Sequence, residues 1–156
     1  MKKTCLLAVV SAIALSLMLA ACTSGGESSG GSVEEATVAQ LSDNVVEVSL
    51  DSASSTVESE VTIKDGESFT VASKLISGEA VVVAKFPQGE YSDYAYEGCS
   101  ASQTEVDPGT YAITVKPSNA SGVIYILSYP TGQLDVTDAD NEALYKQVAE
   151  YARSAS

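Results

Sequence analysis

The chain has 156 residues, the length of a single domain, and carries 21 acidic against 8 basic residues for a formal net charge of −13. A surface this acidic repels phosphate-rich polymers, so the composition argues against nucleic-acid binding. The chain has no histidine, which removes Ser-His-Asp and Cys-His nucleophiles and zinc sites built on imidazole.

The N-terminus has the layout of a secretory signal peptide. Lys2 and Lys3 open the chain, an uncharged apolar segment follows, and the small residues Ala20 and Ala21 stand before Cys22. A transmembrane helix, which needs about 20 apolar residues, is the competing interpretation. The small residues, together with the Gly/Ser-rich stretch after Cys22, favour cleavage. Both interpretations place the remaining chain outside the cytoplasm.

The tetrad Leu19-Ala20-Ala21-Cys22 resembles the lipobox of bacterial lipoproteins. The resemblance implies that residues 1–21 are a lipoprotein signal peptide and that Cys22, linked to a diacylglycerol, becomes the first residue of the mature chain. It also implies a lipid-anchored protein on the extracytoplasmic face of the cell membrane, with the membrane as a partner through Cys22. Each buried methylene of such an anchor contributes about 0.8 kcal/mol.

Residues 23–32 form a Gly/Ser-rich stretch that predicts a flexible linker. We expect residues 22–43 to be a lipidated tether and linker. Two alternatives stay open for residues 33–43: Ser32 and Glu35 have the spacing of a helix cap, which predicts a short helix, and the same segment could instead extend the tether.

Cysteine use leaves one thiol in the processed chain. Cys5 leaves with the signal and Cys22 takes the lipid, so only Cys99 remains and no internal disulfide can form. Stability must then come from a packed core. Cys99 is either a small buried hydrophobe or a reactive thiol, and the first is favoured because no histidine is present to lower its pKa.

From about Asn44 apolar and polar residues alternate with period two, starting with Val46 and Val48. This pattern predicts roughly seven or eight short strands. Turn signals separate the strands at Asp65-Gly66, Ser77-Gly78, Pro87–Gly89, Asp107–Gly109 and residues 117–122. The continuous apolar run Ala80–Phe86, broken by Lys85, predicts a central strand. The fold class expected for residues 44–156 is a mainly β antiparallel sandwich with one C-terminal helix.

The helix is expected over residues 138–152, with Thr137 as its cap. Acidic residues in the first turn suit a helix N-terminus, where negative charge is stabilising by about 0.3–1 kcal/mol. Leu144, Val148 and Tyr151 fall on one face, which predicts packing against the sandwich.

The run from Val106 to Tyr125 resembles an element of small bacterial envelope β-sandwiches, in which a turn of the type Asp-x-Gly-Thr-Tyr leads into an alternating strand. Here that element reads Asp107-Pro108-Gly109-Thr110-Tyr111, and a second turn follows at Ser121-Gly122. With the lipobox, it is similar to accessory lipoprotein modules of Gram-positive bacteria. The resemblance concerns the fold and carries no site residue over.

One group of residues offers oxygen ligands for calcium, namely Asp135, Asp138, Asp140, Asn141 and Glu142. A calcium loop also needs a glycine where the chain turns sharply, and none is present there. Acids at a helix start are the favoured interpretation. We therefore predict no metal site, no cofactor and no catalytic residue.

Tyrosines interleave with acids over residues 90–99. Tyr91, Asp93, Tyr94 and Tyr96 are candidate partner-binding residues, because tyrosine is enriched at binding surfaces and carboxylates accept hydrogen bonds from hydroxyl groups. The competing interpretation is an ordinary strand whose alternate tyrosines pack inward.

The function expected from the sequence is a non-catalytic binding or interaction module that holds an envelope protein or a glycan. One alternative is a structural envelope protein without a discrete site. The other is a carboxylate-based hydrolase, which is disfavoured because a short acidic chain rarely encloses the cleft that such chemistry needs.

Overall fold

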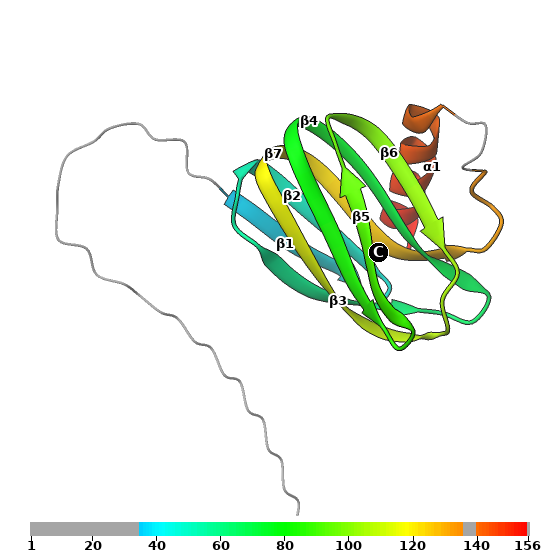
Figure 1. Ribbon diagram of the computed structural model, residues 1–156. Coiled ribbons are helices and arrows are strands. Elements are labelled where there is room, and N and C mark those ends of the chain that lie inside the picture. Colours follow the sequence, from blue (N-terminus) through cyan, green and yellow to red (C-terminus); the bar gives the residue numbers. More distant parts are fainter. Residues whose placement is uncertain (1–34, 136–139, 156) are drawn as a thin grey trace, which may run out of the picture. The chain divides into compact units, whose positions relative to one another are not determined.

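The computed structural model describes residues 35–135 and 140–155, which hold seven strands and one helix (Figure 1). The strands are β1 (Glu35–Ser42), β2 (Val45–Ala53), β3 (Val57–Ile63), β4 (Glu67–Phe86), β5 (Gly89–Ala95), β6 (Gly98–Thr104) and β7 (Gly109–Pro130), and the helix is α1 (Asn141–Ser154). The predicted signal peptide, the lipobox and the cap Thr137 lie outside the described residues.

Two long strands build the sandwich. β4 has 20 residues and β7 has 22, and they pair antiparallel along most of their length. Both fold over at the same end, at Leu75–Glu79 of β4 and Ser118–Gly122 of β7, which we call the bend (Figure 1). The first half of β4 and the second half of β7 form one layer, and the remaining halves form the other.

The other strands extend these layers. In the helix-side layer, β2 pairs with the second half of β7, β1 pairs with β2, and β6 pairs with the first half of β4. In the open layer, β3 pairs with the first half of β7 and β5 with the second half of β4. The prediction of a mainly β antiparallel fold with one C-terminal helix is confirmed.

The prediction that strands end at Ser77-Gly78 and at residues 117–122 is wrong. The chain bends there, but β4 and β7 remain paired on both sides of the bend, with register shifts at Ser77. Because the two irregularities face each other, the hydrogen bonding resumes after each shift. The turns at Asp65-Gly66 and Pro87–Gly89 are confirmed as the ends of strands.

The segment expected as linker or short helix up to residue 43 contains strand β1. Its register pairs Glu35 with Asp51 and continues to Ser42 opposite Val45. Ala36 and Val38 are half-buried and pack against the core. Residues two positions apart lie on the same face of a strand but not of a helix, so this packing requires a strand.

The core lies between the two layers and is made of inward-facing aliphatic side chains. Its largest fully buried members include Val46, Val48, Val61, Ile63, Val82, Ile113, Val115, Ile124 and Ile126. Four aromatic rings close the core at the end opposite the bend. Phe69 meets Phe86 and Tyr91 edge-on at ring-centroid distances of 5.3 and 5.9 Å, and Phe86 meets Tyr111 at 4.7 Å.

Helix α1 covers the outer face of the helix-side layer (Figure 1). It begins at Asn141 rather than residue 138, because the side chain of Asp140 caps it by accepting a 3.0 Å hydrogen bond from the Glu142 amide. Its apolar face packs on Val45, Ala72, Tyr125, Leu127 and Tyr129 through Leu144, Val148, Ala149 and Ala152. The predicted docking of this helix is therefore confirmed.

Alkaline pH is expected to weaken this helix–sheet interface. Burial is the largest cause that raises the pKa of Tyr125, Tyr145 and Tyr151, and a hydrogen bond to Glu47 adds to it at Tyr125. A raised folded-state pKa means that the stability these phenols contribute is complete below their unfolded pKa of about 10, and is lost as pH rises through the folded pKa. Denaturant titrations at increasing pH should show the free energy of unfolding falling as tyrosinate absorbance appears. A triple Tyr→Phe variant at these positions should flatten the curve, and an equally steep fall in that variant would contradict the assignment.

Candidate functional site

The sandwich has two open edges, each bridged by a side-chain hydrogen bond. Between β1 and β3, the Ser59 hydroxyl donates to Gln40 Oε1 at 2.9 Å. Between β5 and β6, the Ser102 hydroxyl donates to the Asp93 carboxylate. A hollow lies at each edge, and the two hollows differ in the chemistry of their walls.

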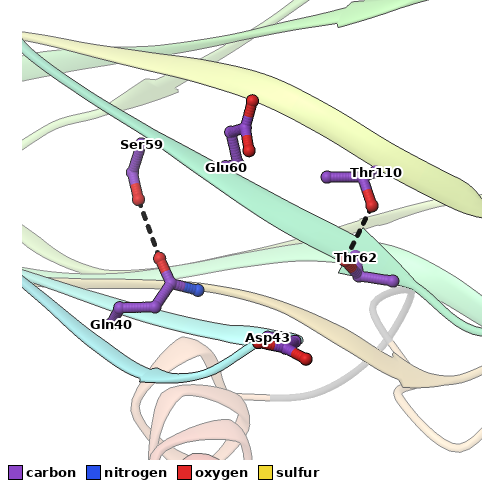
Figure 2. A pocket seen from close by; sticks show the side chains of 6 residues that line it. All are labelled: Gln40, Asp43, Ser59, Glu60, Thr62 and Thr110. Atoms are coloured by element: carbon purple, nitrogen blue, oxygen red, sulfur yellow. Dashed lines mark hydrogen bonds between the residues drawn. The ribbon is translucent and has the colours of Figure 1, made fainter. Parts of the chain in front are cut away.

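The β1–β3 hollow has a volume of about 350 Å³ and is lined by six polar or charged residues, Gln40, Asp43, Ser59, Glu60, Thr62 and Thr110 (Figure 2). Gln40 is already occupied, because its Nε2 also donates to the Ser42 carbonyl at 2.7 Å. The Thr62 and Thr110 hydroxyls share a 2.9 Å hydrogen bond. The carboxylates of Asp43 and Glu60 stand well apart in Figure 2. This hollow offers hydrogen-bond acceptors, but no aromatic ring lines it.

The hollow at the β5–β6 edge combines apolar and polar walls, and we call it the aromatic hollow. It has a volume of about 270 Å³ and is lined by Phe86, Gln88, Gly89, Glu90, Tyr91, Thr104, Glu105 and Val106. Glu90 and Glu105 are exposed, and no hydrogen bond or ion pair engages either carboxylate within the described part of the chain. An apolar wall with a few polar groups on its rim is typical of a ligand pocket.

Local structure braces the aromatic hollow on both sides. The turn between β4 and β5 carries Gln88, whose Nε2 donates to the Asp107 carboxylate at 2.7 Å. Asp107 belongs to the loop between β6 and β7, and its carbonyl accepts a 2.5 Å hydrogen bond from the Tyr111 hydroxyl. Phe69 supports Tyr91 from the core. The walls are therefore held in place before any ligand arrives.

A third hollow, of about 320 Å³, lies on the outer face of the open layer. Its walls include Glu58, Glu60 and Lys85, together with small side chains of β7 such as Ala112 and Thr114. No aromatic ring lines it. Like the β1–β3 hollow, it therefore offers no aromatic ring on which a ligand could stack.

The candidate partner-binding residues do not converge on one surface. Tyr91 lines the aromatic hollow, and Asp93 is held in the edge hydrogen bond to Ser102. Tyr94 and Tyr96 are 57% and 59% exposed and line none of the three hollows described above. The alternation of side chains along β5 explains the division, because Tyr91 and Asp93 differ from Tyr94 by an odd number of positions and so lie on the opposite face of the strand.

Sequence reasoning misses most of the aromatic hollow. Phe86 reads as the end of a central strand, and Thr104, Glu105 and Val106 come from the end of β6 and the loop after it. Those residues reach Tyr91 only because β5 and β6 both pair with β4, on its opposite halves. The tyrosine-rich segment 90–99 is the one signal in the sequence that points to this site.

A second surface feature lies at the bend. Ile76, Tyr94 and Tyr96 are the large hydrophobic side chains left exposed in the described residues, with Ile76 at 73%. Leu75 bridges to Glu97, and Tyr94 pairs with Val81, so all three side chains lie near the bend. We call them the bend patch. The aromatic hollow lies toward the opposite end, beside the β4–β5 turn.

Asp138 of the candidate calcium group lies outside the described residues. Within residues 35–135 and 140–155, no three His, Cys, Asp or Glu side chains gather as metal ligands, and Asp140 instead caps the helix. Cys99 is a half-buried free thiol on β6, so its burial does not distinguish a small core residue from a reactive thiol. Over the same ranges, no helix has the length and apolar character needed to span a membrane.

Comparison with known proteins adds little. No protein-family model matches the chain, and no curated protein matches it. A solved structure titled "CBM4 structure and function" is similar at 10% sequence identity and a TM-score of 0.35, covering 64% of this chain and 80% of that one. A similarity this distant does not establish a shared ligand.

Proposed function

We propose that this chain is a non-catalytic binding module, anchored by lipid on Cys22 to the outer face of the cell membrane, and that it takes a saccharide in the aromatic hollow. The lipobox resemblance supports the anchor. The observation that carries the ligand proposal is that the aromatic rings of Tyr91 and Phe86 and the carboxylates of Glu90 and Glu105 line the same hollow.

The two kinds of wall match the two kinds of surface on a sugar. A pyranose presents C–H groups that pack against an aromatic face, and the hydroxyls around its edge donate hydrogen bonds to carboxylates. Glu90 and Glu105 are free to accept them, and the Tyr91 hydroxyl has no partner among the described residues. Because two carboxylates line the hollow, neutral or amino sugars are favoured over anionic ones.

A binding role suits these carboxylates better than hydrolysis does. A glycosidase needs a carboxylic acid kept protonated by an apolar environment beside a second, ionised carboxylate. Glu90 and Glu105 are both exposed to solvent. We therefore assign them to hydrogen bonding rather than to proton transfer.

Substitutions in the hollow should reduce saccharide affinity. A hydrogen bond to a charged group contributes about 1.5–3 kcal/mol, so Glu90→Gln and Glu105→Gln should each weaken binding by about 10-fold or more. Tyr91→Leu removes the ring face and should weaken binding at least as much. The measurement is calorimetric titration of the chain with the best ligand from an array of neutral and amino oligosaccharides.

The matched controls are Tyr94→Leu and Glu58→Gln, which change the same residue types outside the aromatic hollow. Both should bind as the natural chain does. Thermal unfolding of every variant separates lost affinity from lost fold. Binding that survives in Tyr91→Leu and Glu90→Gln, or an array without any bound saccharide, would refute the proposed ligand site.

A further inference from the structure

The bend patch is an unusual surface for an acidic protein. Three large apolar side chains stand exposed at one end of the fold, and none lines any of the three hollows described above. Exposed apolar groups that gather in one place mark an interaction surface. Tyrosine in particular is enriched where proteins meet the interface of a bilayer, since its ring is apolar and its hydroxyl stays hydrated.

The chain enters the fold at the same end. Glu35, the first described residue, pairs with Asp51 of β2. The neighbouring Leu50 pairs with Gly122 of β7, and Gly122 pairs with Leu75 of β4, so these residues form one row across the layer at the bend. A lipid on Cys22 therefore connects to the domain at the end that carries the bend patch. A coil as long as the segment from Cys22 to Glu35 reaches about 20 Å.

We propose that the bend patch rests on the bilayer that holds the lipid anchor, so that the aromatic hollow faces away from the membrane. This inference depends on the proposed anchor at Cys22. A tether this short keeps the domain at an effective concentration near the millimolar range. At that effective concentration the bend patch can contact the bilayer even if the same contact is too weak to bring an untethered protein to the membrane.

Charge decides which bilayer surface the patch fits. Glu79 and Glu97 flank the patch and are exposed, as are Lys74 and Lys116. Glu35 and Asp51 add two exposed acids at the same end, so this end carries more acids than bases. The patch therefore suits zwitterionic headgroups, and anionic lipid should weaken the contact through repulsion that added salt screens.

The chain has no tryptophan, which allows a direct test. The full lipidated chain carrying Tyr96→Trp is reconstituted in phosphatidylcholine vesicles with brominated acyl chains, and its fluorescence is compared with that in unbrominated vesicles. Lys64→Trp, in the exposed turn at the opposite end, is the matched control. We expect bromine to reduce Y96W emission at least twofold and K64W emission by little. Adding Ile76→Ser and Tyr94→Ser should remove the quenching while the protein still floats with the vesicles.

Each remaining outcome overturns the inference. Lipidated chain that floats with vesicles but shows equal emission from Y96W and K64W keeps the anchor and refutes the contact. Chain whose mass shows no lipid, and which does not float, refutes the anchor and the contact that depends on it. Y96W emission that changes with protein density instead of bromine identifies a second copy of the chain as the occupant of the patch.

Discussion

Replacing Gly122 with alanine is expected to lower the free energy of unfolding by about 4 kcal/mol or more, most of the stability of a domain at the low end of the usual range of about 5–15 kcal/mol. Gly122 has φ of +145°, a conformation that costs other residues about 1–3 kcal/mol. A Cβ there would also lie 2.8 Å from the Leu75 Cα and closer still to the Lys74 carbonyl. Both atoms belong to the backbone of the paired strand β4, so relief would require the two strands to separate at the bend.

Gly89 provides the matched control. Its φ is +143°, almost the same as that of Gly122, but a Cβ at Gly89 would have no other atom within 4 Å. Gly89→Ala should therefore cost only the conformational part, about 1–3 kcal/mol. Urea denaturation of both variants measures the difference. Equal losses would show that close approach of β4 and β7 at the bend is not what requires glycine at position 122.

Replacing Val148 with aspartate is expected to separate helix α1 from the sheet. Val148 is fully buried and shares an apolar cluster with Val45, Ala72 and Leu127. An unpaired carboxylate in that position costs several kcal/mol, and about 3–5 kcal/mol is typical when a buried charge loses its partner. Denaturant unfolding should show this loss, and hydrogen exchange should accelerate in the helix before it does in the core strands.

Ala143→Asp introduces the same residue on the exposed side of the same helix. Because it lies in the first turn, near the positive end of the helix dipole, we expect its effect on stability to stay within about 0.5 kcal/mol. If this variant loses as much stability as Val148→Asp, the helix is sensitive to aspartate anywhere and the packing explanation fails. If neither loses stability, helix docking contributes little to the fold.

Period-two alternation is enough to predict the fold class, but not the path of the long strands. Val46 and Val48 alternate clearly with polar residues, and the strand predicted there is present as β2. Ser77-Gly78 has the composition of a turn, and nothing local distinguishes a turn that ends a strand from a bend that a facing strand follows. That distinction depends on β7, about forty residues further along the chain.

The same limit applies to the candidate site. Tyr91 stands out because tyrosines cluster in its segment, and it does line the aromatic hollow. Its neighbours Thr104 and Glu105 carry no signal of their own, since only the shared pairing with β4 brings them near. Composition groups Tyr94 and Tyr96 with Tyr91, whereas strand geometry separates them. Topology, rather than residue type, decides which of these side chains meet.

The most direct test of the central claim, that the aromatic hollow binds a saccharide, is an NMR titration of the isotope-labelled domain with the best oligosaccharide from the array. We predict that the largest amide shifts fall at Phe86–Tyr91 and Thr104–Val106, the two segments that line the hollow. Shifts centred on Gln40, Ser59 and Thr62 instead, or a spectrum unchanged at saturating saccharide, would contradict the claim.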